Sequence, residues 1–146
     1  MRLRTAFLAA LLPAALAAAP RHFEVGASFV SPARPGADAA VAVTFVALDP
    51  DVRVNEEPAP RLKLDPAQAV LVDKQKPVSS RGEAFDPEKA RYLDLAAPVL
   101  FPVALSPGAP KGSQAVKGSV TYFYCSKREG WCRKGTADVS VAVTVP

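Results

Sequence analysis

Residues 119–135 read SVTYFYCSKREGWCRKG, and this stretch determines the fold of the C-terminal part of the chain. In its first half Val120, Tyr122 and Tyr124 share one face and Thr121, Phe123 and Cys125 share the other, which is the period-two pattern of a strand. Six residues, including Gly130, separate Cys125 from Cys132, and a second alternating run starts near Thr136. The stretch therefore predicts a β-hairpin with one cysteine on each side of its loop.

The two cysteines are the only two in the chain, and they form one obvious pair. Residues that face each other in a non-hydrogen-bonded antiparallel pair have Cα atoms about 4.5 Å apart, which a disulfide can bridge. We expect such a bond between Cys125 and Cys132. Closing a loop of about eight residues stabilises the fold by roughly 2.5 kcal/mol, which is modest for a disulfide.

The surroundings of this pair also suit redox chemistry. Exposed disulfides are more often the reducible ones, and nearby cations favour a thiolate over a thiol. Lys127, Arg128, Arg133 and Lys134 supply four positive charges, which Glu129 partly opposes. The residues expected to surround the cysteines are Tyr122, Tyr124, Lys127, Arg128, Trp131 and Arg133. A purely structural disulfide is the alternative reading of the same spacing.

Short alternating runs recur along the rest of the chain and are expected to be strands. They span residues 22–29, 41–47, 61–64, 69–73, 99–105, 116–124 and 139–145. The chain has 15 prolines, which rule out long helices, and single helical turns are expected only at 65–68 and 85–90. About seven short strands with Pro/Gly turns predict an all-β, antiparallel β-sandwich.

The N-terminus has the features of a signal peptide over residues 1–19. Arg2 and Arg4 give it a positive start, residues 6–16 are apolar, and small residues follow at 17–19, where we expect cleavage. The apolar run is shorter than the roughly 20 residues that span a membrane. We therefore expect a single domain at 20–146 that is periplasmic or secreted and does not insert into a membrane after processing.

Other chemistry has little support in the sequence. The formal net charge is +4, and +2 without Arg2 and Arg4; no basic stripe with interleaved aromatics predicts nucleic-acid binding. His22 is the single histidine and is expected at the surface or at a sheet edge. The carboxylates in the segments 55–57 and 83–86, which are Glu56, Glu57, Glu83 and Asp86, are expected to be solvated. We expect no metal site and no cofactor.

The cysteine hairpin resembles the N-terminal periplasmic domain of the thiol:disulfide interchange protein DsbD. The resemblance rests on residues 118–125, on Cys132 and on the alternating final strand. Residues 54–58 with 61–64 look like an early strand pair of that family, and 99–105 looks like the strand before its cysteine hairpin. The six-residue spacing is one longer than expected in the family, and Arg133 stands where a proline is common.

This resemblance implies an immunoglobulin-like sandwich that relays reducing equivalents through Cys125 and Cys132. Its partners would be a thioredoxin-like or membrane-bound thiol:disulfide electron donor on one side and exported client proteins on the other. A cap loop shields the cysteines in that family, and the matching residues here are Phe85, Glu83 and Asp86.

Two hypotheses follow from the sequence. The first is an exported thiol–disulfide exchange module. The second is a non-enzymatic immunoglobulin-like binding or structural domain in which the disulfide only stabilises the fold.

Overall fold

The computed structural model describes residues 21–31, 38–75 and 91–146 of the chain. The expected signal peptide at 1–19, the expected cap residues Glu83, Phe85 and Asp86, and the turn expected at 85–90 lie outside the described residues. Every regular element within the described ranges is a strand, and no helix there is long and apolar enough to cross a membrane.

Eight strands make up the described part of the chain. They are β1 (Phe23–Val30), β2 (Ala39–Ala47), β3 (Val52–Val54), β4 (Arg61–Leu64), β5 (Leu71–Asp73), β6 (Val99–Leu105), β7 (Gly112–Ser126) and β8 (Trp131–Val145). All seven expected strands are confirmed, and β7 and β8 extend well beyond the predicted runs. The additional strand, β3, has only three residues, which is too short for an alternating pattern to reveal it.

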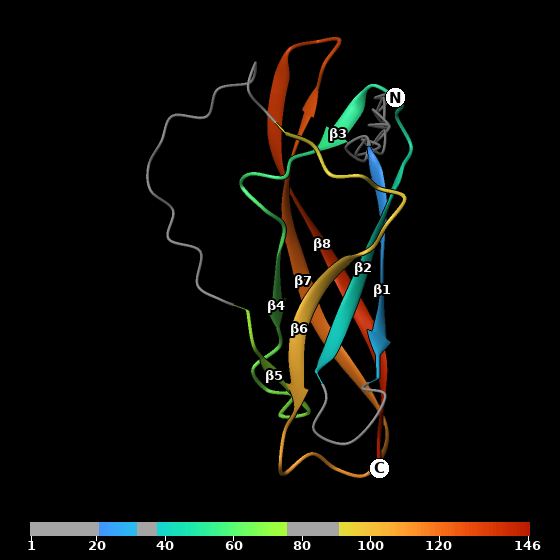
Figure 1. Cartoon of the computed structure of the whole chain (residues 1–146), viewed down its shortest axis with the longest axis vertical. Coiled ribbons are helices and arrows are strands. Elements are labelled where there is room, and N and C mark those ends of the chain that lie inside the picture. The colour runs from blue at the N-terminus through green and yellow to red at the C-terminus, as the bar shows by residue number, and fades with distance from the viewer. Residues whose placement is uncertain (1–20, 32–37, 76–90) are drawn as a thin grey trace, which may run out of the picture.

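The strands form two antiparallel sheets packed as a β-sandwich, which confirms the predicted fold class (Figure 1). One sheet has the order β1-β2-β6-β5. In the other, β7 is the central strand: β8 pairs along its whole length, while β3 and β4 pair with successive parts of it. The hairpin of β7 and β8 extends to one end of the elongated molecule, where β3 lies beside it.

The core lies between the two sheets and is built largely from valine. β-Branched residues pack well on a pleated surface, which suits them to alternate positions facing inward. The inward residues are fully or almost fully buried, and they include Val41, Val43, Phe45, Phe101, Val103, Val116, Val120, Val141 and Val143. Ala47 shares a face of β2 with Val41, Val43 and Phe45 but is exposed, because it stands at the end of that strand.

The β7–β8 hairpin is held in register by fifteen facing pairs from Gly112↔Val145 to Ser126↔Trp131. Gly130 ends its turn with φ of 70°, a left-handed conformation that glycine adopts without strain. Gly135 faces Tyr122, and a Cβ at this glycine would lie 2.6 Å from Cζ of the Tyr122 ring. Glycine at 135 therefore lets the ring lie against the β8 backbone.

Residues 65–68 form a turn after β4, where a single helical turn was expected. The Gln68 amide donates to the Asp65 carbonyl at 3.1 Å, and the Ala67 amide donates to the Asp65 side chain at 3.0 Å. Short aspartates commonly bond to the backbone two residues on, and this stabilises an isolated turn. Gln68 also accepts a 2.5 Å hydrogen bond from the Lys117 amide, which ties the turn to β7.

Candidate functional site

Cys125 and Cys132 form a disulfide, as the sequence predicts. They face each other in the β7–β8 register, with Cα atoms 4.0 Å apart and residue numbers that differ by seven. The bond therefore crosses the hairpin directly, close to its turn. It joins two strands that are already paired along their full length.

The two cysteines differ in their exposure to solvent. Val120 and Tyr122 point into the core, so the alternation of β7 places Cys125 on the outer face of its sheet. Cys125 is nevertheless only 3 % exposed, because β3 pairs alongside it and puts Arg53 opposite it. Cys132, on the outer strand of the hairpin, is exposed. One residue of the pair is thus exposed to solvent and the other is covered.

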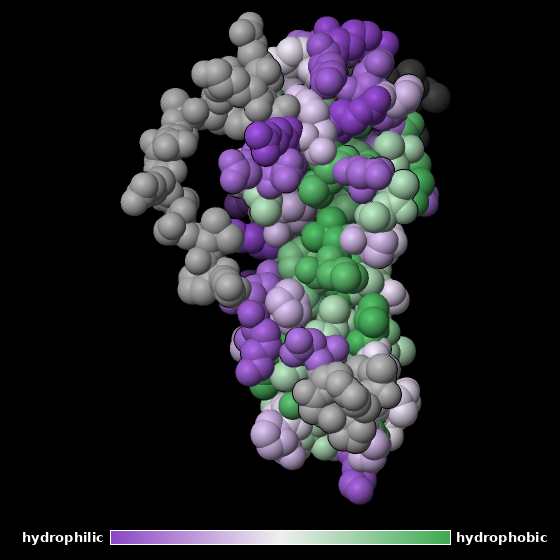
Figure 2. Space-filling view, in the orientation of Figure 1, coloured by the Kyte–Doolittle hydropathy of each residue, from purple (hydrophilic) through white to green (hydrophobic). Residues whose placement is uncertain are grey.

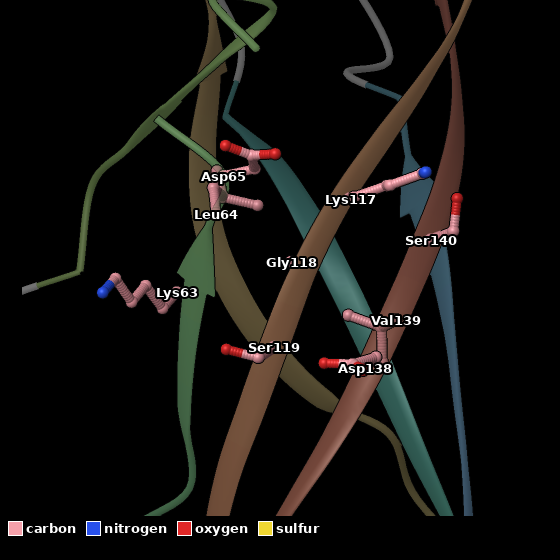
Figure 3. Close-up of a pocket in the computed structure, with 9 residues that line it drawn as sticks. All are labelled: Lys63, Leu64, Asp65, Lys117, Gly118, Ser119, Asp138, Val139 and Ser140. Carbon is pink, nitrogen blue, oxygen red and sulfur yellow. The ribbon is translucent and has the colours of Figure 1, made fainter. Parts of the chain in front are cut away.

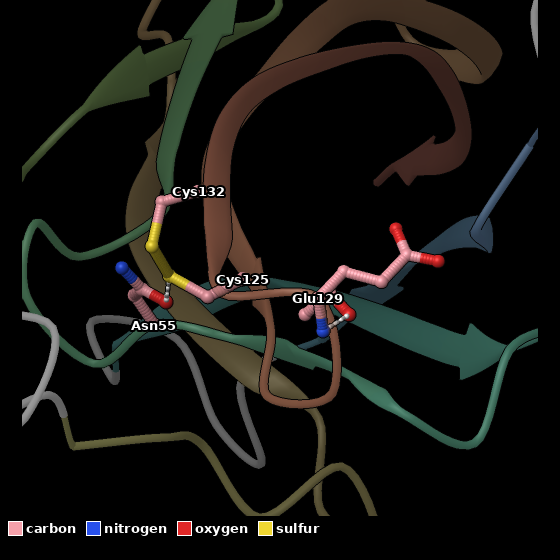
Figure 4. The surroundings of a disulfide bond; sticks show 5 residues. Asn55, Cys125, Glu129 and Cys132 are labelled. Atoms are coloured by element: carbon pink, nitrogen blue, oxygen red, sulfur yellow. Dashed lines mark hydrogen bonds between the residues drawn. A yellow bond between two sulfur atoms is a disulfide. The ribbon is translucent and has the colours of Figure 1, made fainter.

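Asn55 lies directly against the buried cysteine (Figure 4). Its Oδ1 is 3.3 Å from Sγ of Cys125, and the residue is 1 % exposed. A disulfide sulfur carries no proton, so this contact becomes a hydrogen bond once Cys125 is a thiol that can donate. The carbonyl oxygen of Asn55 is therefore placed to stabilise the reduced form.

Backbone pairing on both sides fixes the position of Asn55. Its amide donates to the Phe123 carbonyl at 2.8 Å, and it forms an isolated antiparallel bridge with Tyr92. The Leu93 amide donates to Val54, and the Glu56 amide donates to Arg91, each at 2.8–2.9 Å. Asn55 thus sits in a short stretch of ladder between β7 and residues 91–93, which leaves its side chain little freedom.

Aromatic side chains support the other face of the hairpin. Tyr124 and Trp131 meet edge to face with ring centroids 5.8 Å apart, and His22 packs within 5.6 Å of both rings. His22 was expected at the surface or at a sheet edge, and it directly precedes β1, the edge strand of its sheet. Only 14 % of its side chain is exposed, because these two rings cover it. Its Nδ1 lies 3.6 Å from a carboxylate oxygen of Asp49.

Tyr122 was expected near the cysteines but belongs to the core. Its ring packs edge to face against Phe23 and Phe45, with centroids 5.9 and 5.1 Å away. Burial raises the pKa of Tyr122 above its usual value, and the neighbouring Tyr124 raises it further. Its role is packing beneath the hairpin.

The expected cations gather at the end of the hairpin. Lys127 lies over the Tyr92 ring at 5.0 Å, and the Arg133 guanidinium lies over the Trp131 ring at 4.2 Å. Arg128 forms an ion pair with Asp51 at 3.1 Å and a weaker one with Glu129 at 3.9 Å.

A separate open groove of about 620 Å³ lies on the outer face of β4, β7 and β8 (Figure 3). Gly118 at its centre is about 23 Å along the strand from Cys125, at about 3.3 Å per residue. Lys63 and Lys117 point to opposite sides of it, so its polar groups do not converge on one ligand. We therefore place the candidate site at the disulfide.

Most of the predicted site residues come together, and one important residue was missed. The cysteines, Tyr124, Trp131 and the cations share the end of the hairpin, whereas Tyr122 is in the core. Asn55 was not predicted, because β3 is too short for its pattern to stand out and Asn55 meets Cys125 only through pairing with segments distant in sequence. Within the described ranges no three His, Cys, Asp or Glu side chains gather closely enough to hold a metal ion.

Comparison with known protein families, with curated proteins and with solved structures finds no match.

Proposed function

We propose that this chain is an exported thiol–disulfide exchange module that relays reducing equivalents through Cys125 and Cys132. The observation that carries the proposal is the asymmetry of the disulfide: Cys132 is exposed, whereas Cys125 is 3 % exposed and lies against Asn55. Exchange needs one accessible sulfur for attack and a second cysteine that is released and can later resolve the intermediate.

The first half of the proposed reaction begins with a thiolate of a dithiol donor. It attacks Sγ of Cys132, a new S–S bond joins donor and Cys132, and the Cys125–Cys132 bond breaks. The electron pair of that bond leaves on Cys125, which takes a proton from solvent and can donate its S–H to Asn55. The Asn55 carbonyl thus stabilises the protonated Cys125 thiol that this step produces.

The donor's second thiolate completes the transfer. It attacks the donor sulfur of the mixed disulfide, which releases Cys132 and oxidises the donor to a disulfide. Two electrons and two protons have then moved to this chain. Reduced Cys132 attacks a client disulfide, and Cys125 resolves that intermediate, so the chain returns to its oxidised form.

The disulfide's position argues against a mainly structural role. It crosses a hairpin that already has fifteen facing residue pairs, and it closes a short loop. The chain-entropy model gives such a loop only about 2.5 kcal/mol, whereas closing a loop of about 100 residues gives about 4.7. A structural domain would gain more by joining distant strands.

Trapping experiments with single variants test the proposal. In Cys125→Ala the free Cys132 should react rapidly with a small aromatic disulfide such as dithiobis(nitrobenzoate) and accumulate a mixed disulfide, since the leaving thiol is released to solvent and no resolving thiol remains in the protein. In Cys132→Ala the buried Cys125 should react several times more slowly. Both variants should show native circular dichroism spectra. Equal reaction rates, or faster reaction at Cys125, would contradict the proposed roles.

A further inference from the structure

Positive charge gathers at the end of the hairpin that carries the exposed cysteine. Arg53, Lys127, Arg128, Arg133 and Lys134 are all exposed, and together they form what we call the cationic rim. Arg53 faces Cys125 across the β3–β7 pair, and Lys134 follows Cys132 by two positions, on the same face of β8. Figure 2 shows hydrophilic side chains gathered at this end of the molecule.

Among the described residues, the acids near the rim pair with one of its cations. Asp51 and Glu129 both pair with Arg128, and Glu129 also accepts the indole N–H of Trp131. Within the described part of the chain, Lys127 and Arg133 have no carboxylate partner. Their charges rest on the rings of Tyr92 and Trp131.

Holding a cation over an aromatic ring orders the charge without cancelling it, because the ring has no net charge. Lys134 and Arg53 likewise have no ion pair among the described residues, and Arg53 bonds only to backbone carbonyls of Pro50 and Val52 there. Among the described residues, four of the five rim charges therefore have no carboxylate partner.

We propose that the cationic rim selects a redox partner whose dithiol is surrounded by carboxylates, that is, an acidic protein surface around a reactive cysteine. Complementary charge speeds diffusional encounter and disfavours partners of the same sign. The rim also attracts the partner's attacking thiolate toward the Cys132 sulfur. This inference rests on the proposed exchange function and adds the kind of partner that the site accepts.

Synthetic dithiol peptides test the inference. Three peptides share a Cys-Gly-Pro-Cys core and carry flanking aspartates, asparagines or lysines. Each peptide is mixed with the oxidised protein at low and at high salt. The reaction is stopped with acid, and the rate of reduction of the Cys125–Cys132 bond is measured by mass spectrometry. The rate for each peptide is divided by the rate at which the same peptide reduces hydroxyethyl disulfide, which carries no charge. Differences in the intrinsic reactivity of the peptide thiols then cancel.

The acidic peptide should react roughly three- to tenfold faster than the neutral one at low salt, and the basic peptide should react more slowly than both. The advantage should shrink at high salt. It should also be lost in the triple variant Lys127→Gln, Arg133→Gln and Lys134→Gln.

The matched control removes three charges far from the disulfide. It carries Lys63→Gln, Lys111→Gln and Lys117→Gln, all at exposed positions, and should keep the acidic preference. Equal rates for the three peptides, or the same loss in both triple variants, would overturn the inference. These rate ratios do not depend on the reduction potential, so failure of the exchange function itself would appear separately.

Discussion

Replacing Asn55 tests whether this residue raises the reduction potential of the Cys125–Cys132 pair. The side chain is 1 % exposed, with Oδ1 3.3 Å from Sγ of Cys125. Asn55→Leu keeps a similar volume and removes the acceptor. Because the hydrogen bond exists only when Cys125 is a thiol, its loss destabilises the reduced form by about 0.5–1 kcal/mol. At about 30 mV per 1.4 kcal/mol, the reduction potential should fall by about 10–20 mV.

The assay equilibrates the protein in glutathione buffers, traps the thiols with acid and an alkylating agent, and counts reduced molecules by mass. Val54→Ala is the control: it destabilises the neighbouring β3 without touching the sulfur, so it weakens oxidised and reduced forms alike and should leave the potential unchanged. An unshifted potential in Asn55→Leu would refute the role of Asn55. So would an equal shift in Val54→Ala.

Three further predictions concern stability. Cys125→Ala combined with Cys132→Ala should stay folded, lose about 2.5 kcal/mol in urea unfolding and lose all exchange with thioredoxin; gross unfolding would favour the structural hypothesis. Gly135→Ala should cost about 1–3 kcal/mol in the same assay, since its Cβ would lie 2.6 Å from the Tyr122 ring; a neutral effect would contradict that packing. The pKa of the Tyr122 hydroxyl is raised in the folded state, so the folded protein holds the hydroxyl proton more tightly than the unfolded chain does. The contribution of Tyr122 to the free energy of unfolding is therefore complete below about pH 10 and is lost as the pH rises through the folded-state pKa. Urea unfolding in alkali should therefore show a smaller loss above pH 10 for Tyr122→Phe, and identical pH profiles would refute this.

The main strands and the cysteine pair could be predicted because local pattern determines them. The Val139–Val145 alternation has one apolar face, so it fits only a strand with that face buried. The facing of Cys125 and Cys132 follows from two strands joined by a short turn. Neither inference needs knowledge of distant contacts.

The missing parts of the prediction depend on contacts between distant segments. Which cysteine is buried depends on β3 and on residues 91–93, which are far from the hairpin in sequence. Asn55 can be recognised as part of the site only when that pairing places it beside Cys125. His22 is covered because Trp131 and Tyr124 pack on it, and no pattern around residue 22 could show this.

The reduction potential of the Cys125–Cys132 pair tests the central claim most directly. Structural disulfides of secreted proteins generally have potentials below about −300 mV, out of reach of the glutathione pool. An exchange module must cycle between both forms, so we predict a value above about −300 mV in glutathione or thioredoxin redox buffers. A value well below that limit would contradict the exchange function and leave the disulfide a structural one.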